Sequence, residues 1–229
     1  MILLLGRNNF ESIPASITNL SMLSSLDLSY CAKLRSLPEL PCQLLSIDAH
    51  NCVSLEASLS LPILFSRNSS QNLRVNFINC FKLVDQNAFE KIVEDALKKF
   101  EILARKKFTA PGRAFIFFTG NEIPQRFRFK RTGSAITFSM PRYLTAFKSF
   151  GLTVCAIVEF QTYHDNEGQG MLVGFDCILA GKYGTKSFQG TSGGWDFCSG
   201  RDYVDTDHVF LGYDRSFDQI VRLEDNFYI

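Results

Sequence analysis

The sequence predicts an α+β fold in which the short end of a leucine-rich-repeat solenoid is followed by a capping helix and an antiparallel β-sandwich. Three observations support this order. A leucine-rich pattern recurs in residues 1–83, apolar residues recur at helical spacing in residues 84–110, and short apolar segments separated by glycine-rich or polar stretches fill residues 111–229. We expect the three parts to have these boundaries.

The first part repeats the pattern L-x-x-L-x-L-x-x-N/C-x-L at intervals of about 20–29 residues. Its copies comprise Leu3, Leu5, Asn8 and Phe10; Leu23, Leu26, Leu28 and Cys31; Leu44, Ile47, Ala49 and Cys52; and, in degenerate form, Val75, Phe77 and Cys80. Residues two apart face one side of a strand. We therefore expect strands near Leu26–Leu28, Ile47–Ala49 and Val75–Phe77, with an irregular insertion over residues 56–72.

Cys31, Cys52 and Cys80 fall where each repeat turns away from its strand. A side chain there fills a tight corner or serves backbone groups that have left the ladder. We therefore expect buried structural cysteines rather than metal ligands or nucleophiles.

The remaining global properties bear on the compartment and the partner. Seven cysteines, none at C-x-x-C spacing, are typical of a reducing compartment, so we expect a cytoplasmic and possibly nuclear protein. No apolar run is long enough to span a membrane. A net charge of +1 gives no strong attraction to nucleic acid or to an anionic membrane, so neither is expected as a partner.

Residues 85–107 are predicted to form an amphipathic helix that caps the repeats. Acidic side chains lie early in it and basic ones late, which suits the helix dipole. The residues at intervals of three and four that would face the core are Phe89, Ile92, Val93, Ala96, Leu97, Phe100 and Leu103. The segment Thr109–Gly112 then ends the helix.

Beyond the helix the sequence predicts short strands, which together suggest a sandwich. The expected strands are Ala114–Thr119, Phe127–Lys130, Ala135–Met140, Gly151–Phe160, Met171–Leu179 and His208–Tyr213. Two long loops, Gln161–Gly170 and Gly181–Arg201, are expected between them.

Several motifs suggest chemistry, but each has a better structural interpretation. Gly190–Gly194 matches G-x-S-x-G, yet a nucleophile elbow needs a strand before the serine and a helix after it. The flanks here predict a mobile loop instead. His50, His164 and His208 have no second ligand at metal-site spacing. We therefore expect no catalytic residue, no cofactor and no metal site.

The segment Arg126–Arg131 interleaves basic and aromatic residues, as single-strand nucleic-acid binders do. Period-two alternation would place Phe127 and Phe129 on one strand face and the cations on the other. A half-buried strand explains this pattern, and we prefer it. If the cationic face binds a partner, an acidic protein surface suits it better than nucleic acid.

Five segments resemble plant disease-resistance receptors that combine a TIR domain, a nucleotide-binding domain and leucine-rich repeats. In family order, Phe77–Leu83 resembles FxNCFKL, Thr119–Phe127 resembles PGxEIPxWF, Gly133–Thr137 resembles GSSVTI, Phe150–Val158 resembles FLGFALCAVV, and Asp207–Tyr213 resembles DHVFLGY. The resemblance implies a C-terminal jelly-roll/Ig-like domain from residue 111 and recognition of pathogen effectors. Thr119 and Arg126 replace the family's proline and tryptophan, so no role of that tryptophan is carried over.

The resemblance leads us to expect a fragment of such a receptor, without its TIR and nucleotide-binding chemistry, that binds a pathogen effector protein. The alternative is an intramolecular structural or autoinhibitory module that packs on other domains or protomers of the receptor. Loop aromatics favour contact because such residues dominate interface hot spots, although Trp195 could instead plug the end of the sandwich. The candidate contact residues are Trp195, Tyr183, Phe188, Phe197, Tyr163, His164, Arg126, Arg128 and Lys130.

Overall fold

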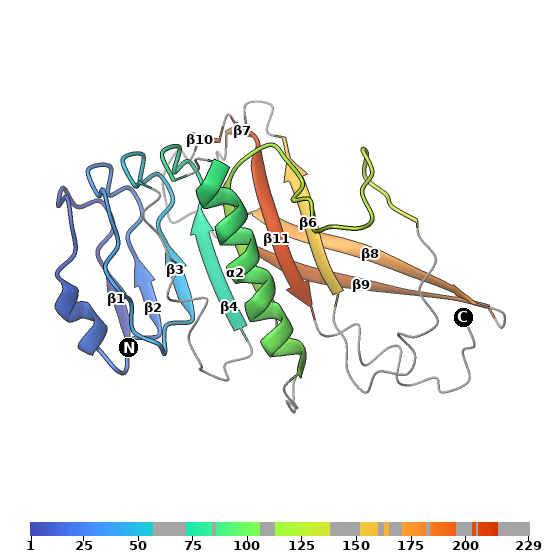
Figure 1. The fold of residues 1–229 in the computed structure, drawn as a ribbon, viewed down its shortest axis with the longest axis horizontal. Coiled ribbons are helices and arrows are strands. Elements are labelled where there is room, and N and C mark those ends of the chain that lie inside the picture. Colours follow the sequence, from blue (N-terminus) through green and yellow to red (C-terminus); the bar gives the residue numbers. More distant parts are fainter. Residues whose placement is uncertain are drawn as a thin grey trace.

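The computed structural model describes residues 1–56, 72–83, 86–105, 113–137, 152–159, 163–164, 171–181, 184–195, 203–204 and 206–214. These residues form an α+β fold on a seven-stranded mixed sheet (Figure 1). In spatial order its strands are β1 (Ile2–Leu4), β2 (Ser25–Asp27), β3 (Ser46–Asp48), β4 (Asn72–Phe77), β5 (Arg113–Thr119), β11 (His208–Asp214) and β6 (Leu152–Val158). A short 3-10 helix, η1 (Ala15–Asn19), follows Pro14 between β1 and β2.

The repeat strands lie where the leucine pattern predicted them. β2, β3 and β4 overlap the three expected segments, and the side chains of Leu26, Leu28, Ile47, Val75 and Phe77 are buried. β1 to β5 are all parallel. The insertion expected over residues 56–72 lies almost wholly outside the described residues.

The sheet continues without a break past residue 111, where a domain boundary was expected. β5 pairs in parallel with β4 along one edge and antiparallel with β11 along the other, and β11 pairs antiparallel with β6. The strand therefore joins the repeat pattern directly to the C-terminal β structure.

Helix α2 (Gln86–Arg105) covers one face of this sheet, as Figure 1 shows. Phe89 contacts Phe118 of β5 edge to face at 5.5 Å between ring centroids, and Phe100 stacks on Tyr213 of β11 at 5.5 Å. The row that this face presents runs in register across six strands: Leu3, Leu26, Ile47, Val75, Ile116 and Leu211. The predicted helix and its apolar face are thus confirmed. No helix in the described part of the chain is long and apolar enough to cross a bilayer.

A hairpin covers the opposite face, but only at the C-terminal end of the sheet (Figure 1). It consists of β8 (Met171–Gly181) and β9 (Gly184–Trp195), paired antiparallel. Beneath it Phe115, Phe117 and Phe210 form a second buried cluster, against which Val173 of β8 packs. Two β layers are therefore stacked at this end of the molecule.

The expected loop at Gly181–Arg201 is wrong over residues 184–195, which form strand β9. Glycine-rich sequence has low strand propensity and reads as a loop, yet here it supplies a bulge. Val173 faces Gly193 and Gly174 faces Thr191, so Ser192 is the extra residue on its strand. The G-x-S-x-G segment therefore lies within a strand, without the strand–turn–helix geometry of a nucleophile elbow.

The expected strand at Phe127–Lys130 is also wrong. The Phe127 amide donates to the Pro124 carbonyl at 3.2 Å, which closes a turn, and the following residues bend. Phe127 packs on the main core, whereas the side chain of Phe129 is 40% exposed. The two rings thus do not share a buried face, so the alternation does not mark a strand.

Two further expectations are only partly described. Ala135–Thr137 are not in a strand, and the rest of the expected strand lies outside the described residues. Within the expected loop at Gln161–Gly170, Tyr163–His164 form the short strand β7, paired with β10 (Tyr203–Val204). Its remaining residues are outside the described part.

Truncation of Leu28 tests the core of the repeat region. Its side chain is fully buried, so we expect Leu28→Ala to lower the free energy of unfolding by about 2–5 kcal/mol in urea titrations. Met22, 75% exposed in the same repeat, is the matched control, and Met22→Ala should be near neutral. Equal effects of the two substitutions would contradict this assignment of the core.

Candidate protein-contact surface

Each repeat turns away from its strand through a residue in the left-handed region. In the described part of the chain four non-glycine residues have positive φ: Arg7, Tyr30, Asn51 and Asn79, at 58–60°. Each precedes the Asn or Cys of the repeat pattern. The left-handed backbone is uncommon for such residues, so its recurrence marks one turn geometry built four times.

Backbone hydrogen bonds link these turns into a series that we call the turn ladder. The Arg7 amide donates to the Ser29 carbonyl at 2.6 Å, Tyr30 to His50 at 2.9 Å, and Asn51 to Ile78 at 2.8 Å. These three left-handed residues thus each donate to a carbonyl of the next turn. The amide of Asn79, the fourth residue of the series, donates instead to Nε2 of His208 at 3.0 Å.

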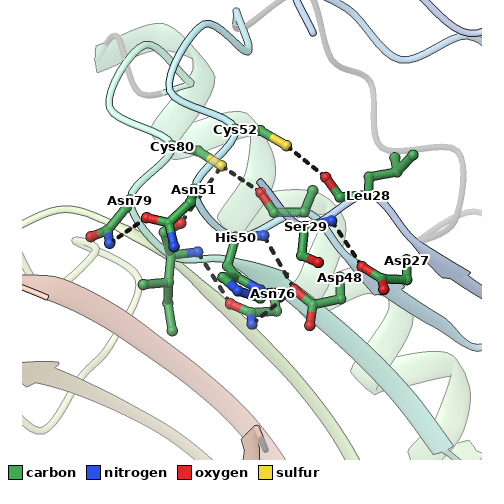
Figure 2. A network of polar contacts seen from close by, with 12 residues as sticks. Asp27, Leu28, Ser29, Asp48, His50, Asn51, Cys52, Asn76, Asn79 and Cys80 are labelled. Atoms are coloured by element: carbon green, nitrogen blue, oxygen red, sulfur yellow. Dashed lines mark hydrogen bonds and ion pairs between the residues drawn. The ribbon is translucent and has the colours of Figure 1, made fainter. Parts of the chain in front are cut away.

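The cysteine after each of three left-handed residues bonds to the backbone of the preceding repeat. The thiols of Cys31, Cys52 and Cys80 donate to carbonyls of Leu5, Leu28 and Ala49 at 3.2, 3.1 and 3.0 Å (Figure 2 shows the last two). Burial raises the pKa of Cys52 to about 12 and raises the pKa values of Cys31 and Cys80. The full burial of the three cysteines and their hydrogen bonds to backbone carbonyls confirm the prediction that they are buried residues at the repeat corners.

Polar side chains at the strand ends form a second series. Asp27, Asp48 and Asn76 each accept the amide two residues later, at 2.8, 3.2 and 3.1 Å. Asp48 Oδ1 also lies 2.7 Å from Nδ1 of His50 and accepts from the Asn76 amide side chain at 3.1 Å (Figure 2). One carboxylate therefore joins two repeats, and this local satisfaction of turn amides is what Asp and Asn supply best.

An exposed cation and an aromatic ring extend this network to the surface. The Arg7 guanidinium lies 5.0 Å from the centroid of the Tyr30 ring, a cation–π distance. Tyr30 in turn meets the buried His50 ring edge to face at 4.8 Å. The contacts from Arg7 through Tyr30 and His50 to Asp48 thus cross three repeats.

The sheet face opposite α2 is polar along β2 to β4, and we call it the polar face. Its residues, in register on one side of the sheet, are Ser25, Asp27, Ser46, Asp48, Arg74 and Asn76. Arg74 is exposed and the first four are half-buried. The same rows continue into Phe115 and Phe117 of β5, which the β8–β9 hairpin helps to bury. The polar face therefore ends where the hairpin begins.

The cationic contact candidates lie together on the turn after β5. Arg126, Arg128 and Lys130 are all exposed. Arg126 approaches Glu94 of α2 at 3.8 Å, Arg128 lies over the Phe129 ring at 5.6 Å, and Lys130 Nζ donates to the Ile123 carbonyl at 3.1 Å. The three cations therefore lie exposed on one turn, and each side chain makes one of these contacts.

The aromatic candidates are distributed over separate elements. Trp195 ends β9 opposite Met171, and Phe188 lies in β9 opposite Cys177. Tyr163 and His164 form β7, in a different two-stranded sheet. Tyr183 and Phe197 lie outside the described residues. The expected protein-contact role of these residues therefore remains a proposal.

Sequence reasoning missed the polar series and the ladder. The signal for the first was available, because Asp27, Asp48 and Asn76 recur in step with the cysteines. No local pattern marks His208 as a partner of Asn79, since the bond joins residues far apart in the chain.

The protonated, buried state of the corner thiols is open to direct test. Brief iodoacetamide treatment of the native chain should label the exposed Cys42 and spare Cys52 and Cys80, because only an accessible thiolate reacts. Peptide mass spectrometry reads out each site, and labelling in denaturant is the control. Reaction of Cys80 as fast as Cys42 would contradict the geometry of the turns.

Comparison with known proteins identifies the family. The model of the C-JID domain matches residues 118–228. The chain is 33% identical over 233 residues to disease resistance protein RPS4B of Arabidopsis thaliana, covering 97% of this chain and 20% of that protein. It is 31% identical over 234 residues to disease resistance-like protein DSC1 of the same plant, covering 94% of this chain and 18% of DSC1.

A third relative gives the same result. Disease resistance protein RPP2B of Arabidopsis thaliana is 32% identical over 204 residues, covering 82% of this chain and 17% of RPP2B. The chain thus spans about a fifth of the length of the first curated relatives it matches. With the C-JID match and this similarity along most of its length, the chain belongs to the TIR-type family of plant disease-resistance proteins.

Proposed function

We propose that this chain is a protein-recognition region of an intracellular plant immune receptor, and that it binds pathogen effector proteins to trigger defence signalling. Its role in plant immunity follows from the family; effector binding is the step that we add. The observation that carries this step is the polar face, an ordered array of side chains lying beside a second β layer.

Within this proposal, β1 to β4 are the end of a leucine-rich-repeat solenoid, and the stacked layers after α2 are a jelly-roll/Ig-like domain. Stacked repeats present a strand-lined face that generally binds proteins. The turn ladder and the three thiol hydrogen bonds support a repeating unit of this kind. A rigid frame of this type suits recognition because its side chains lose little entropy on binding.

The polar face favours a polar and charged partner surface. Asp48 lies on β3 and the exposed Arg74 on the neighbouring strand β4, where Arg74 pairs with Ser46, so both signs of charge lie on neighbouring strands. Such mixed patterns select partners by charge complementarity more than by area. The cationic turn, with Arg126, Arg128 and Lys130, would add a contact for acidic groups.

We propose that the candidate residues on and next to β9, together with those of β7, supply the apolar part of the contact. Trp195, Phe188, Tyr183 and Phe197 lie close in sequence, Tyr163 and His164 form β7, and all six lie within residues 118–228 that match the C-JID domain. Large aromatic side chains bury much area at little rotamer cost. The chain would then act by binding rather than by catalysis, in the cytoplasm or the nucleus.

The alternative is an intramolecular module that packs on the nucleotide-binding domain and holds the receptor inactive. The same polar face and cationic turn could serve that contact, and exchange between the two contacts would couple recognition to activation. The two functions differ in which partner the surface retains.

A pull-down separates these functions and tests the contact residues. We expect the chain to retain a pathogen effector from a defined panel, and the Trp195→Ala variant to lose retention at unchanged melting temperature. Retention of the receptor's nucleotide-binding domain alone would favour the intramolecular module. Loss of melting stability in the Trp195→Ala variant would make Trp195 a core residue and remove it from the contact.

The cationic turn is tested in the same experiment. Arg128→Glu with Lys130→Glu should weaken effector retention and reduce its dependence on salt. Lys33→Glu with Lys82→Glu changes the net charge equally at two other exposed sites and is the matched control. Equal weakening by both pairs would assign the effect to net charge rather than to the turn.

A further inference from the structure

The turn ladder ends on a side chain. Three of its left-handed residues donate their amides to backbone carbonyls of the following turn. The fourth, Asn79, follows β4, and its amide donates to Nε2 of His208 at 3.0 Å. The imidazole nitrogen thus occupies the place in the series that a carbonyl of a further repeat would take.

The hydrogen bonds of His208 define its tautomer. Because Nε2 accepts a hydrogen bond from the Asn79 amide, the neutral ring must carry its proton on Nδ1. Nδ1 lies 2.7 Å from the Thr206 carbonyl, to which it therefore donates. The residue is fully buried, so both ring nitrogens have partners in a site where an unpaired one would be costly.

His208 also stands at a structural junction. It opens β11, where it pairs with Thr119 of β5 on one side and Val158 of β6 on the other. The backbone carbonyl of the preceding residue, Asp207, accepts a hydrogen bond from the Gly120 amide at 3.1 Å. Two consecutive residues therefore hold the turn after β4 and the backbone that leaves β5.

We propose that His208 is the terminal cap of the turn ladder and that it couples the repeat region to the C-JID region. In this role it positions the last repeat turn, and with it Asn51 and the end of the polar face, relative to the β8–β9 layer. Asn79 links the last turn to the preceding one, since its side-chain amide donates to Asn51 Oδ1 at 2.8 Å (Figure 2). This role of His208 does not depend on which partner binds.

In this role the essential feature of His208 is its acceptor atom Nε2 rather than the packing of its ring. In a His208→Gln variant, Oε1 can accept the Asn79 amide, as a carbonyl of a further repeat would. In a His208→Leu variant, a side chain of similar bulk offers no acceptor. The Leu variant should therefore expose the Asn79 amide, and the Gln variant should restore its protection.

Hydrogen exchange by NMR on the full chain reads out this difference. We expect the Asn79 amide to exchange at least about tenfold faster in His208→Leu than in the native chain, as for loss of one buried hydrogen bond. Exchange in His208→Gln should stay near native. The Tyr30 amide, which donates to the His50 carbonyl one turn further along the ladder from His208, is the internal control and should change much less.

The ring itself gives an independent readout. The nitrogen chemical shifts of His208 in the native chain should show an unprotonated Nε2 and a protonated Nδ1. A proton on Nε2 would overturn the proposal even if both variants failed to fold. Equal Asn79 exchange in the Leu and Gln variants, or native protection in the Leu variant, would overturn it as well.

Discussion

Strand β5 connects two kinds of sheet, and the rest of the structure depends on its pairing. It continues the parallel ladder along β4, from the pair Asn72 and Arg113 to the pair Phe77 and Phe118, and it pairs antiparallel with β11 on its other edge. The backbone N–H and C=O groups on both edges of β5 need hydrogen-bond partners at the same time. The register of β5 against β4 therefore fixes the position of β11 along β5, and β11 in turn fixes the position of β6. At its first residue, Arg113 lies 3.4 Å from the buried Asp214 carboxylate of β11.

The same junction divides the sheet face opposite α2 into a polar and an apolar half. Asn76 of β4 and Phe117 of β5 are register partners at the border between the two halves. The β8–β9 hairpin covers this face from β5 onward but not on β2 to β4. Burying Phe117 requires that hairpin, whereas Asp48 and Arg74 remain within reach of solvent. The proposed recognition surface is therefore a consequence of where the second β layer stops, and both halves of the chain must keep their relative position for it to persist.

Residue patterns predicted those parts of the fold that local periodicity controls. Leucines two residues apart predicted the repeat strands, and apolar residues three and four apart predicted helix α2. The corner cysteines were predicted because each occupies the same position in its repeat. Strand β9 could not be predicted in this way, because Gly190–Gly194 gains its structure from pairing with β8 rather than from propensity. The strand expected at Phe127–Lys130 was wrong because aromatic and basic residues alternate there although the two phenylalanines do not share a buried face. The pairing of His208 with Asn79 is invisible locally because it depends on the whole sheet being assembled.

We infer that the repeat region and the C-JID region form one cooperative unit through β5. Equilibrium unfolding followed by two probes tests it most directly. Trp195, the single tryptophan, reports on the β8–β9 layer by fluorescence, and pulsed labelling of Cys80 reports on the last repeat turn. A shared unfolding midpoint for the two probes is the predicted result. Separate midpoints, with Cys80 reactive while Trp195 remains native or the reverse, would contradict the claim.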